Sequence, residues 1–340
     1  MEHRANWVDC AKGVGIILVV YGHVARGIVN AGIPVDVDLF KFIDHVIYSF
    51  HMPLFFFISG LFFQSSFKKR GAVDFLANKV DTIVYPYIIW SLLQGFTEVV
   101  LSKYTNGYVT VTEVLSLLWA PRAQFWFLYA LFEVFFLVTV GYVIFRKNQL
   151  ISTFVVLSLL YTVDFFIPGY IPMGIVGHVL FFVTGIFFYQ GHKFFLKNKT
   201  VFLIISAIAF VAFQYILSIY MALEYVPTEQ LKLLLALVSI FFVVFFSMSL
   251  SGWGGSWLSY LGNYSMPIYL MHILAASAAR ISLKNILGVT FLPLHLIFGT
   301  LIGLGIPIVA MWIINRFKLE FVIFAPRSLS ISKRITKLVM

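Results

Sequence analysis

Long apolar runs separated by short polar segments recur along the whole chain. Each run is close to the roughly 20 residues that a helix needs to cross a bilayer. The stretch VFLIISAIAFVAFQYILSIY at 201–220 has no charged residue. The pattern predicts about ten membrane-spanning helices, near residues 11–30, 46–64, 82–102, 125–145, 150–167, 173–190, 200–220, 231–250, 257–279 and 293–315.

The runs leave no room for a separate soluble domain. We therefore predict an all-α, polytopic membrane helix bundle of about ten transmembrane helices. Residues 1–320 would form a single transmembrane domain and residues 321–340 a basic cytoplasmic tail. Composition agrees with this fold class, because 61% of the residues are hydrophobic and only 11% are charged, with a mean hydropathy of +0.96. A soluble domain carries about 25% charged residues.

The net charge of +10 is distributed unevenly. Most of the 24 lysine and arginine residues fall on the side that holds the N-terminus. This bias places the N-terminus in the cytoplasm, and an even number of spans places the C-terminus there too. Topology and contact with anionic lipid therefore explain the charge, and we expect no nucleic-acid partner. The single cysteine, Cys10, allows no intrachain disulfide.

The first span, DCAKGVGIILVVYGH at 9–23, begins with Lys12 and ends with His23. The two residues are eleven positions apart, or about three helical turns, so they share one helix face within roughly 20°. They are separated by about 16 Å along the axis. A long, thin ligand would reach both side chains.

Four ionisable residues from four spans fall at one level in the outer half of the bilayer: His23, His51, Glu133 and His272. Ionisable groups are costly in lipid, so we expect them to face one another or a cavity. A single histidine in a helix bundle is more commonly a hydrogen-bonded packing residue. A buried carboxylate such as Glu133, in contrast, needs a partner.

Several other residues lie at the two membrane surfaces. Asp44 and His45 precede the second span on the outside and would form either the rim of a site or a wet loop. Tryptophans at the ends of spans fit interfacial belts; they are Trp90, Trp119, Trp126 and Trp312. We take Asp44 and Trp126 as candidate substrate-binding residues.

Cations gather at the inner ends of the first three spans. Lys68, Lys69 and Arg70 are typical of positive-inside anchoring. Lys12 and Lys79 lie at the ends of predicted helices, where cations suit a phosphate-bearing ligand. We therefore expect a phosphate group at Lys12 and Lys79.

An ordered set of motifs covers residues 9 to 272: Lys12 to His23, FHMPLFFFISG, YPYIIW at 85–90, FWFLYALFE at 125–133 and LGNYSMPIYLMH at 261–272. The set resembles the acyltransferase-3 family of bacterial integral membrane O-acyltransferases, and especially its branch that modifies surface sugars. Much of the family has arginine where this chain has Lys12. A pair of arginines before the third-span proline is common elsewhere, whereas NKVDTIVYP has Lys79 alone.

The resemblance implies a multi-pass transferase of the bacterial inner (cytoplasmic) membrane. It would move an acetyl group from acetyl-CoA to a carbohydrate hydroxyl of an O-antigen, capsule or exopolysaccharide. Lys12 and Lys79 would then hold the nucleotide of the donor at the cytoplasmic mouth. The thioester would arrive near His23.

For this reaction we expect His23 to act as general base, because a neutral imidazole suits proton abstraction at neutral pH. Glu133 would orient the ring or stabilise its charged form. His51 or His272 would donate to the developing oxyanion. A variant makes His23 a transient acyl carrier. No metal is expected.

Two other readings of the same residues remain open. Intramembrane histidines and a glutamate also suit a proton-coupled transporter or flippase of an anionic or glycolipid substrate. The absence of an internal repeat argues against it. An assembly subunit of an envelope complex would leave the cost of the intramembrane ionisable residues unexplained. The sequence does not identify the sugar, its hydroxyl, the acyl group, the side of acceptor entry or the oligomeric state.

Overall fold

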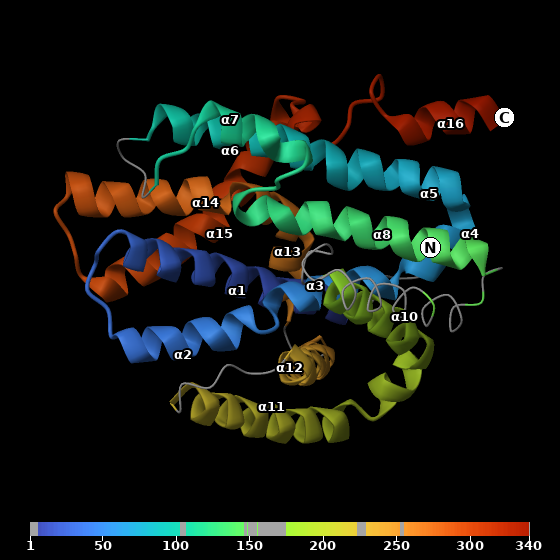
Figure 1. Cartoon of the computed structure of the whole chain (residues 1–340), viewed down its shortest axis with the longest axis horizontal. Helices are drawn as coiled ribbons and strands as arrows, with labels where there is room; N and C mark the ends of the chain where they lie inside the picture. Colours follow the sequence, from blue (N-terminus) through green and yellow to red (C-terminus); the bar gives the residue numbers. More distant parts are fainter. Residues whose placement is uncertain are drawn as a thin grey trace, which may run out of the picture. The chain divides into compact units, whose positions relative to one another are not determined.

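The computed structural model describes residues 6–102, 107–145, 148, 155, 175–222, 229–251 and 255–339. Every regular element in these ranges is a helix (Figure 1). Nine helices of the described residues are long and apolar enough to cross a membrane: Asn6–Asn30, Val37–Leu61, Ala72–Val100, Val111–Ile144, Gly177–Lys197, Lys199–Tyr220, Gln230–Leu250, Ser265–Ile286 and Leu292–Arg316. They confirm the polytopic all-α bundle. The span expected at 150–167 lies outside the described residues, apart from residue 155.

The chain forms two compact units. Unit one contains the described residues of 1–55 and 191–313, and unit two contains those of 56–103, 107–190 and 314–340. Each unit is described by itself.

Unit one is built around helix α1 (Asn6–Asn30). It also contains α2 (Val37–Tyr48), the first residues of α3 (His51–Leu61), α11 (Lys199–Ala222), α12 (Glu229–Leu250), α13 (Ser256–Asn263), α14 (Ser265–Ile281), the π-turn η4 (Ser282–Ile286) and most of α15 (Leu292–Arg316). Helix α1 contacts α2, α12, α13 and α14.

Two glycines allow α1 and α13 to cross with their backbones in contact. A Cβ atom on Gly13 would fall 2.1 Å from the carbonyl oxygen of Leu258, and one on Gly262 would fall 1.8 Å from that of Asp9. Any larger residue would force the helices apart, because the obstructing atoms belong to backbone. The crossing fixes the inner part of α1, which holds Lys12.

The second span begins earlier than the sequence pattern indicates. Asp36 caps α2 by accepting hydrogen bonds from the backbone N–H groups of Asp38 and Leu39, at 3.1 and 3.0 Å. A short turn then leads into α3 at His51. Asp44 therefore lies inside a helix and not in a loop before the span. The hydropathy pattern did not predict α2, because the polar residues of this helix lower its mean hydropathy.

Unit two contains the rest of α3, followed by α4 (Phe63–Arg70), α5 (Ala72–Lys79), the π-turn η1 (Val80–Val84) and α6 (Tyr85–Val100). A loop with α7 (Val111–Leu115) and the 3₁₀ turns η2 (Ser116–Leu118) and η3 (Ala123–Phe125) leads to α8 (Trp126–Ile144). Helix α10 (Ile175–Lys197, to residue 190), η5 (Glu320–Val322) and α16 (Ile331–Val339) complete the unit.

A second glycine crossing joins α3 to α10. A Cβ atom on Gly60 would lie 1.9 Å from the carbonyl oxygen of Phe182, and one on Gly185 would lie 2.0 Å from that of Phe57. The two glycines thus let the backbones of α3 and α10 approach closely. The pair brings Phe56 and the beginning of α10 into the same aromatic cluster.

The segment after α15 is pinned to α6 in unit two. The Trp90 indole N–H donates to the carbonyl oxygen of Val322 at 2.8 Å, and the Tyr85 hydroxyl donates to that of Phe321 at 2.7 Å. Trp90 is only 6% exposed, so it is a packed side chain here, and its interfacial position stays a prediction. Trp119 and Trp312 are 73% and 68% exposed.

The last helix, α16, lies beside α5 (Figure 1). The buried carboxylate of Asp81 accepts from the Ser330 hydroxyl at 2.7 Å and from the backbone N–H groups of Ile331 and Ser332 at 3.0 and 3.2 Å. Asp81 thus caps the N-terminus of α16 from another element. The basic end of the chain is tied to the third span.

Candidate active site

His23 and His272 meet in unit one, although they are 249 residues apart. Nδ1 of His23, on α1, lies 3.3 Å from Nε2 of His272, on α14. Their rings meet edge to face, with centroids 5.0 Å apart. His272 is fully buried and His23 is partly buried.

Hydrogen bonds to backbone carbonyls fix the tautomers of both neutral rings. Nδ1 of His272 lies 3.0 and 2.8 Å from the carbonyl oxygens of Ile268 and Tyr269, and Nδ1 of His23 lies 2.9 Å from that of Val19. A carbonyl only accepts, so each Nδ1 bears the hydrogen. The Nδ1–H of His23 is therefore bifurcated, and Nε2 of His272 is its second acceptor. Nε2 of His23 keeps its lone pair and has no hydrogen-bond partner among the described residues.

The Tyr48 ring contacts both His23 and His51. Its centroid is 4.6 Å from that of the His51 ring and 6.3 Å from that of the His23 ring, both edge to face. Gly22 leaves room for it, because a Cβ atom there would lie 3.0 Å from the tyrosine ring. The Tyr48 hydroxyl is buried and has no hydrogen-bond partner in the described part of the chain.

An arginine closes one side of this cluster. The guanidinium of Arg26 lies 3.2 Å from the centre of the Tyr48 ring. It also donates two hydrogen bonds to the two carboxylate oxygens of Asp44, at 2.7 and 2.8 Å. Such a two-pronged pair fixes the orientation of the guanidinium. Of the two positions that we expected for Asp44, the wet loop is therefore wrong, because Asp44 lies in α2 and holds Arg26. Its role in binding substrate stays a prediction.

Sequence reasoning did not predict Arg26 and Tyr48. Asp44, Tyr48 and His51 follow one another at spacings of four and three residues, which is typical of one helix face. Arg26 follows His23 by three residues, also along one face. The signal was present, but it depended on recognising α2 as a helix.

The outer end of α1 is held by two cations from the end of the ninth predicted span. Arg280 donates to the carbonyl oxygen of Gly27 at 2.6 Å, and Lys284 donates to that of Ala31. The last turn of α1 has no basic residue of its own. These side chains therefore supply the positive charge that favours a helix C-terminus, and they tie α1 to the chain segment that holds His272.

The remaining predicted residues are divided between the units. Lys12 stays in unit one on the same helix as His23, with Nζ 3.4 Å from Asp9 Oδ1. Lys79 belongs to unit two, where its ammonium lies 4.0 Å from the centre of the Phe135 ring. The structure thus does not bring Lys12 and Lys79 together within one unit.

Glu133 and Trp126 also belong to unit two, on α8. Glu133 is partly buried, and its carboxylate forms no hydrogen bond or ion pair with any other described residue. Trp126 is 36% exposed and stacks on His178. Of the four residues expected at one level, the three histidines lie in unit one and Glu133 lies in unit two.

Comparison with known proteins agrees with the motif set. The model of the acyltransferase-3 family, described as an acyltransferase domain, matches residues 5–314. Nodulation protein NolL of Mesorhizobium japonicum (strain LMG 29417 / CECT 9101 / MAFF 303099) is 27% identical over 139 residues, which are 39% of this chain and 34% of the relative. The chain thus spans about a third of the length of that relative. No solved structure matches significantly.

The family model matches residues of both units, and nine helices of the described residues are long and apolar enough to cross a membrane. The chain therefore belongs to the acyltransferase-3 family and is a multi-pass membrane protein.

Proposed function

We propose that the protein transfers an acetyl group from acetyl-CoA to a hydroxyl of a cell-surface or secreted carbohydrate, in the bacterial cytoplasmic membrane. The observation that supports this most directly is the His23 ring. Its Nδ1–H is held by Val19 and His272, and its Nε2 has no partner among the described residues. A ring oriented in this way is ready to accept a proton from a hydroxyl.

The reaction has two proton transfers. The sugar hydroxyl gives its proton to Nε2 of His23 as its oxygen attacks the thioester carbonyl carbon. The tetrahedral intermediate then collapses, the C–S bond breaks, and the leaving thiolate takes the proton back from His23. Between these steps His23 is positively charged. Nε2 of His272 stabilises that charge by accepting the Nδ1–H of His23.

The tautomers change the roles that we expected for the neighbouring residues. Nδ1 of His272 and Nδ1 of His51 both donate to backbone carbonyls, so Nε2 of each neutral ring is an acceptor. Neither ring then donates to an oxyanion. The Tyr48 ring contacts the His23 ring and the Arg26 guanidinium lies over Tyr48, so we assign oxyanion stabilisation to these two donors. A role for Glu133 in orienting His23 stays a prediction.

The length of α1 supports a long donor that reaches from Lys12 to His23. Lys12 and His23 lie on one continuous helix, about 16 Å apart along its axis. Coenzyme A has phosphates at one end and a thioester at the other, joined by a long arm. Phosphates at Lys12 would therefore bring the thioester toward His23. The reaction needs no metal.

The test is made in membranes and in cells. Purified membranes should release free CoA thiol from acetyl-CoA only when the carbohydrate acceptor is present, and His23→Ala should abolish this release while the protein remains abundant. The surface polysaccharide of the same strain should lose about 42 Da per modified sugar, the mass of an acetyl group. Retained acetylation in His23→Ala would disprove the assignment. A polymer that keeps its acyl groups but is missing from the surface would favour a transporter.

A further inference from the structure

Three rings form a stack in unit two. Phe56 is fully buried and lies parallel to His178, with centroids 4.2 Å apart and planes 11° apart. The indole of Trp126 covers the imidazole from another side, at 5.6 Å and 27°. Trp126 is the outermost ring of the stack and is 36% exposed. His178 packs against the indole, and the part of the indole that His178 does not cover stays exposed.

The turn that presents Trp126 is strained. Ala123, three residues earlier, has a φ of 48°, in the left-handed region that non-glycine residues rarely adopt. A residue held there costs on the order of 1 kcal/mol and persists only where its surroundings fix it. Such strain is concentrated at functional sites.

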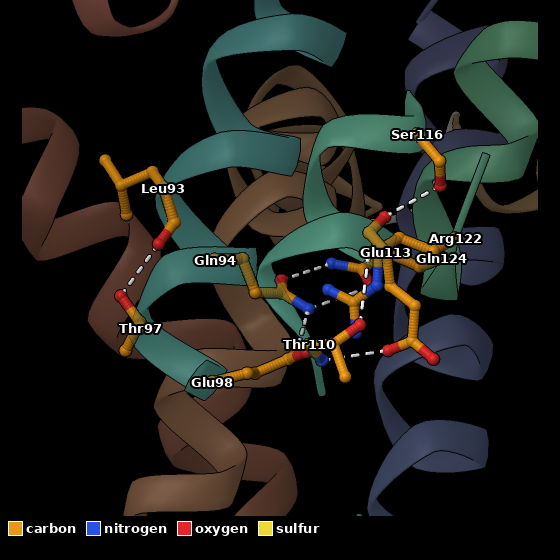
Figure 2. A network of polar contacts seen from close by, with 9 residues as sticks. All are labelled: Leu93, Gln94, Thr97, Glu98, Thr110, Glu113, Ser116, Arg122 and Gln124. Carbon is orange, nitrogen blue, oxygen red and sulfur yellow. Dashed lines mark hydrogen bonds and ion pairs between the residues drawn. The ribbon is translucent and has the colours of Figure 1, made fainter. Parts of the chain in front are cut away.

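A polar network fixes this turn (Figure 2). The buried amides of Gln94 and Gln124 exchange two hydrogen bonds, at 2.6 and 3.3 Å. On the other side of Ala123, Arg122 donates to Glu98 at 2.7 Å. The residues on both sides of Ala123 are thus anchored to α6. A buried network of this kind stabilises one conformation and gives it rigidity.

The residue that follows the turn begins helix α8. Trp126, Tyr129 and Glu133 are spaced three and four residues apart and therefore share one face of α8. Glu133 has no ion-pair or hydrogen-bond partner within the described ranges. An exposed aromatic ring and an unpaired carboxylate on one face are complementary to a sugar, which presents C–H bonds on its ring face and hydroxyl groups at its edge.

An interfacial belt does not account for these features. Trp119, on the same loop, is 73% exposed and has no ring contact with another described side chain, as is typical of a belt residue. Trp126 instead has a backing ring, a strained turn and a network that holds the turn. In unit one, the cavity of about 130 Å³ that Asp44 lines is mostly apolar. That cavity is a poor site for a sugar ring.

We propose that the exposed face of Trp126 is a carbohydrate subsite, on which a pyranose ring of the acceptor stacks, with His178 as the ring that positions the indole and Glu133 as an acceptor for sugar hydroxyls. The inference rests on the proposed function, because it names where the acceptor is held. It goes beyond that function by assigning a second site, in unit two, that acts in binding and not in proton transfer.

The experiment measures binding and turnover separately. The probe is a set of unacylated oligosaccharides, released from the surface polysaccharide of a strain that lacks the gene. Binding to the purified full-length protein is measured without acetyl-CoA, by saturation-transfer NMR and by equilibrium titration. Turnover is measured as release of CoA thiol in the presence of the same oligosaccharides.

We expect Trp126→Ala to weaken oligosaccharide binding about tenfold, as loss of an aromatic contact does, and to raise the acceptor KM with little change in kcat. Trp126→Phe should restore part of the loss. Trp119→Ala is the matched control and should bind as the wild type does. His178→Ala should weaken binding, and His178→Phe, which keeps the stack, should restore most of it.

The outcomes separate the two proposals. Equal binding by the wild type and Trp126→Ala, or equal loss in Trp119→Ala, would overturn the subsite. So would a wild-type protein that binds no oligosaccharide. Binding that depends on Trp126 without any acetyl transfer would keep the subsite and reject the proposed function.

Discussion

Nε2 of the fully buried His272 lies 3.3 Å from Nδ1 of His23 and accepts from it, so a buried imidazole occupies the place where many acyl-transfer sites have a carboxylate. A neutral acceptor stabilises a positively charged His23 less strongly than a carboxylate does. It also avoids the cost of a second charge inside the membrane.

His272→Phe keeps the ring volume and removes the acceptor. We expect kcat to fall by roughly 10- to 100-fold, the usual contribution of a positioned acid or base, with no change in the KM for acetyl-CoA. His45→Ala is the matched control, because the exposed His45 makes the same contact with the carbonyl four residues earlier, at 2.8 Å. Steady-state thiol release measures both variants. A kcat within twofold of the wild type would remove His272 from the mechanism.

Lys12→Ala should raise the KM for acetyl-CoA by about tenfold and leave kcat nearly unchanged, because loss of a remote phosphate contact weakens uniform binding. Lys12→Arg should be mild, since it keeps the charge at the same end of α1. Melting curves of the purified protein show whether the broken contact with Asp9 affects stability. An unchanged KM in Lys12→Ala would contradict the phosphate role.

Asp44→Ala should lower kcat by roughly tenfold, because the guanidinium of Arg26 would lose the pair that holds it over Tyr48. The effect on stability should be small, on the order of 1 kcal/mol, because the Arg26 side chain is 45% exposed. The double variant Arg26→Asp with Asp44→Arg restores the pair but moves the cation to α2. It should recover stability without recovering the rate, and full recovery of the rate would show that the pair is only structural.

Gly13→Ala should lower the melting temperature by about 5 °C or more, because its Cβ would collide with a backbone carbonyl that cannot move alone. Gly305→Ala is the matched control. Gly305 also lies inside a spanning helix, but no atom lies within 4 Å of its added Cβ. Alanine favours helix more than glycine does, so this variant should be as stable as the wild type or more stable. Equal melting of both variants would show that the α1–α13 crossing tolerates a wider spacing.

Asp81→Ala should release α16 from α5, because three donors of the helix start would lose their acceptor. Limited trypsin digestion followed by mass spectrometry should then find faster cleavage at Lys333 and Arg334. Asp38→Ala, an exposed aspartate of α2, is the control and should digest as the wild type does. Unchanged cleavage in Asp81→Ala would mean that apolar contacts alone hold α16.

The sequence by itself determined the fold class and which ionisable residues lie inside the spans. Apolar runs of the right length predicted nine spans that the structure contains, because a segment in lipid must satisfy its backbone hydrogen bonds internally and therefore forms a helix wherever it falls in the bundle. The cost of ionisable groups in lipid pointed to His23, His51 and His272 before their partners were known.

Only the tertiary structure decided which of these groups meet. Three sets of contacts join different helices, with sequence separations up to 249 residues: the pairing of His23 with His272, the ring contacts of Tyr48 with two histidines, and the bond between Arg26 and Asp44. The same holds for the cap that Asp81 provides to α16 and for the network that holds Ala123 in its strained conformation. Hydropathy and residue spacing describe one helix at a time. Contacts between helices depend instead on where glycines let two backbones approach and on how side-chain shapes fit together.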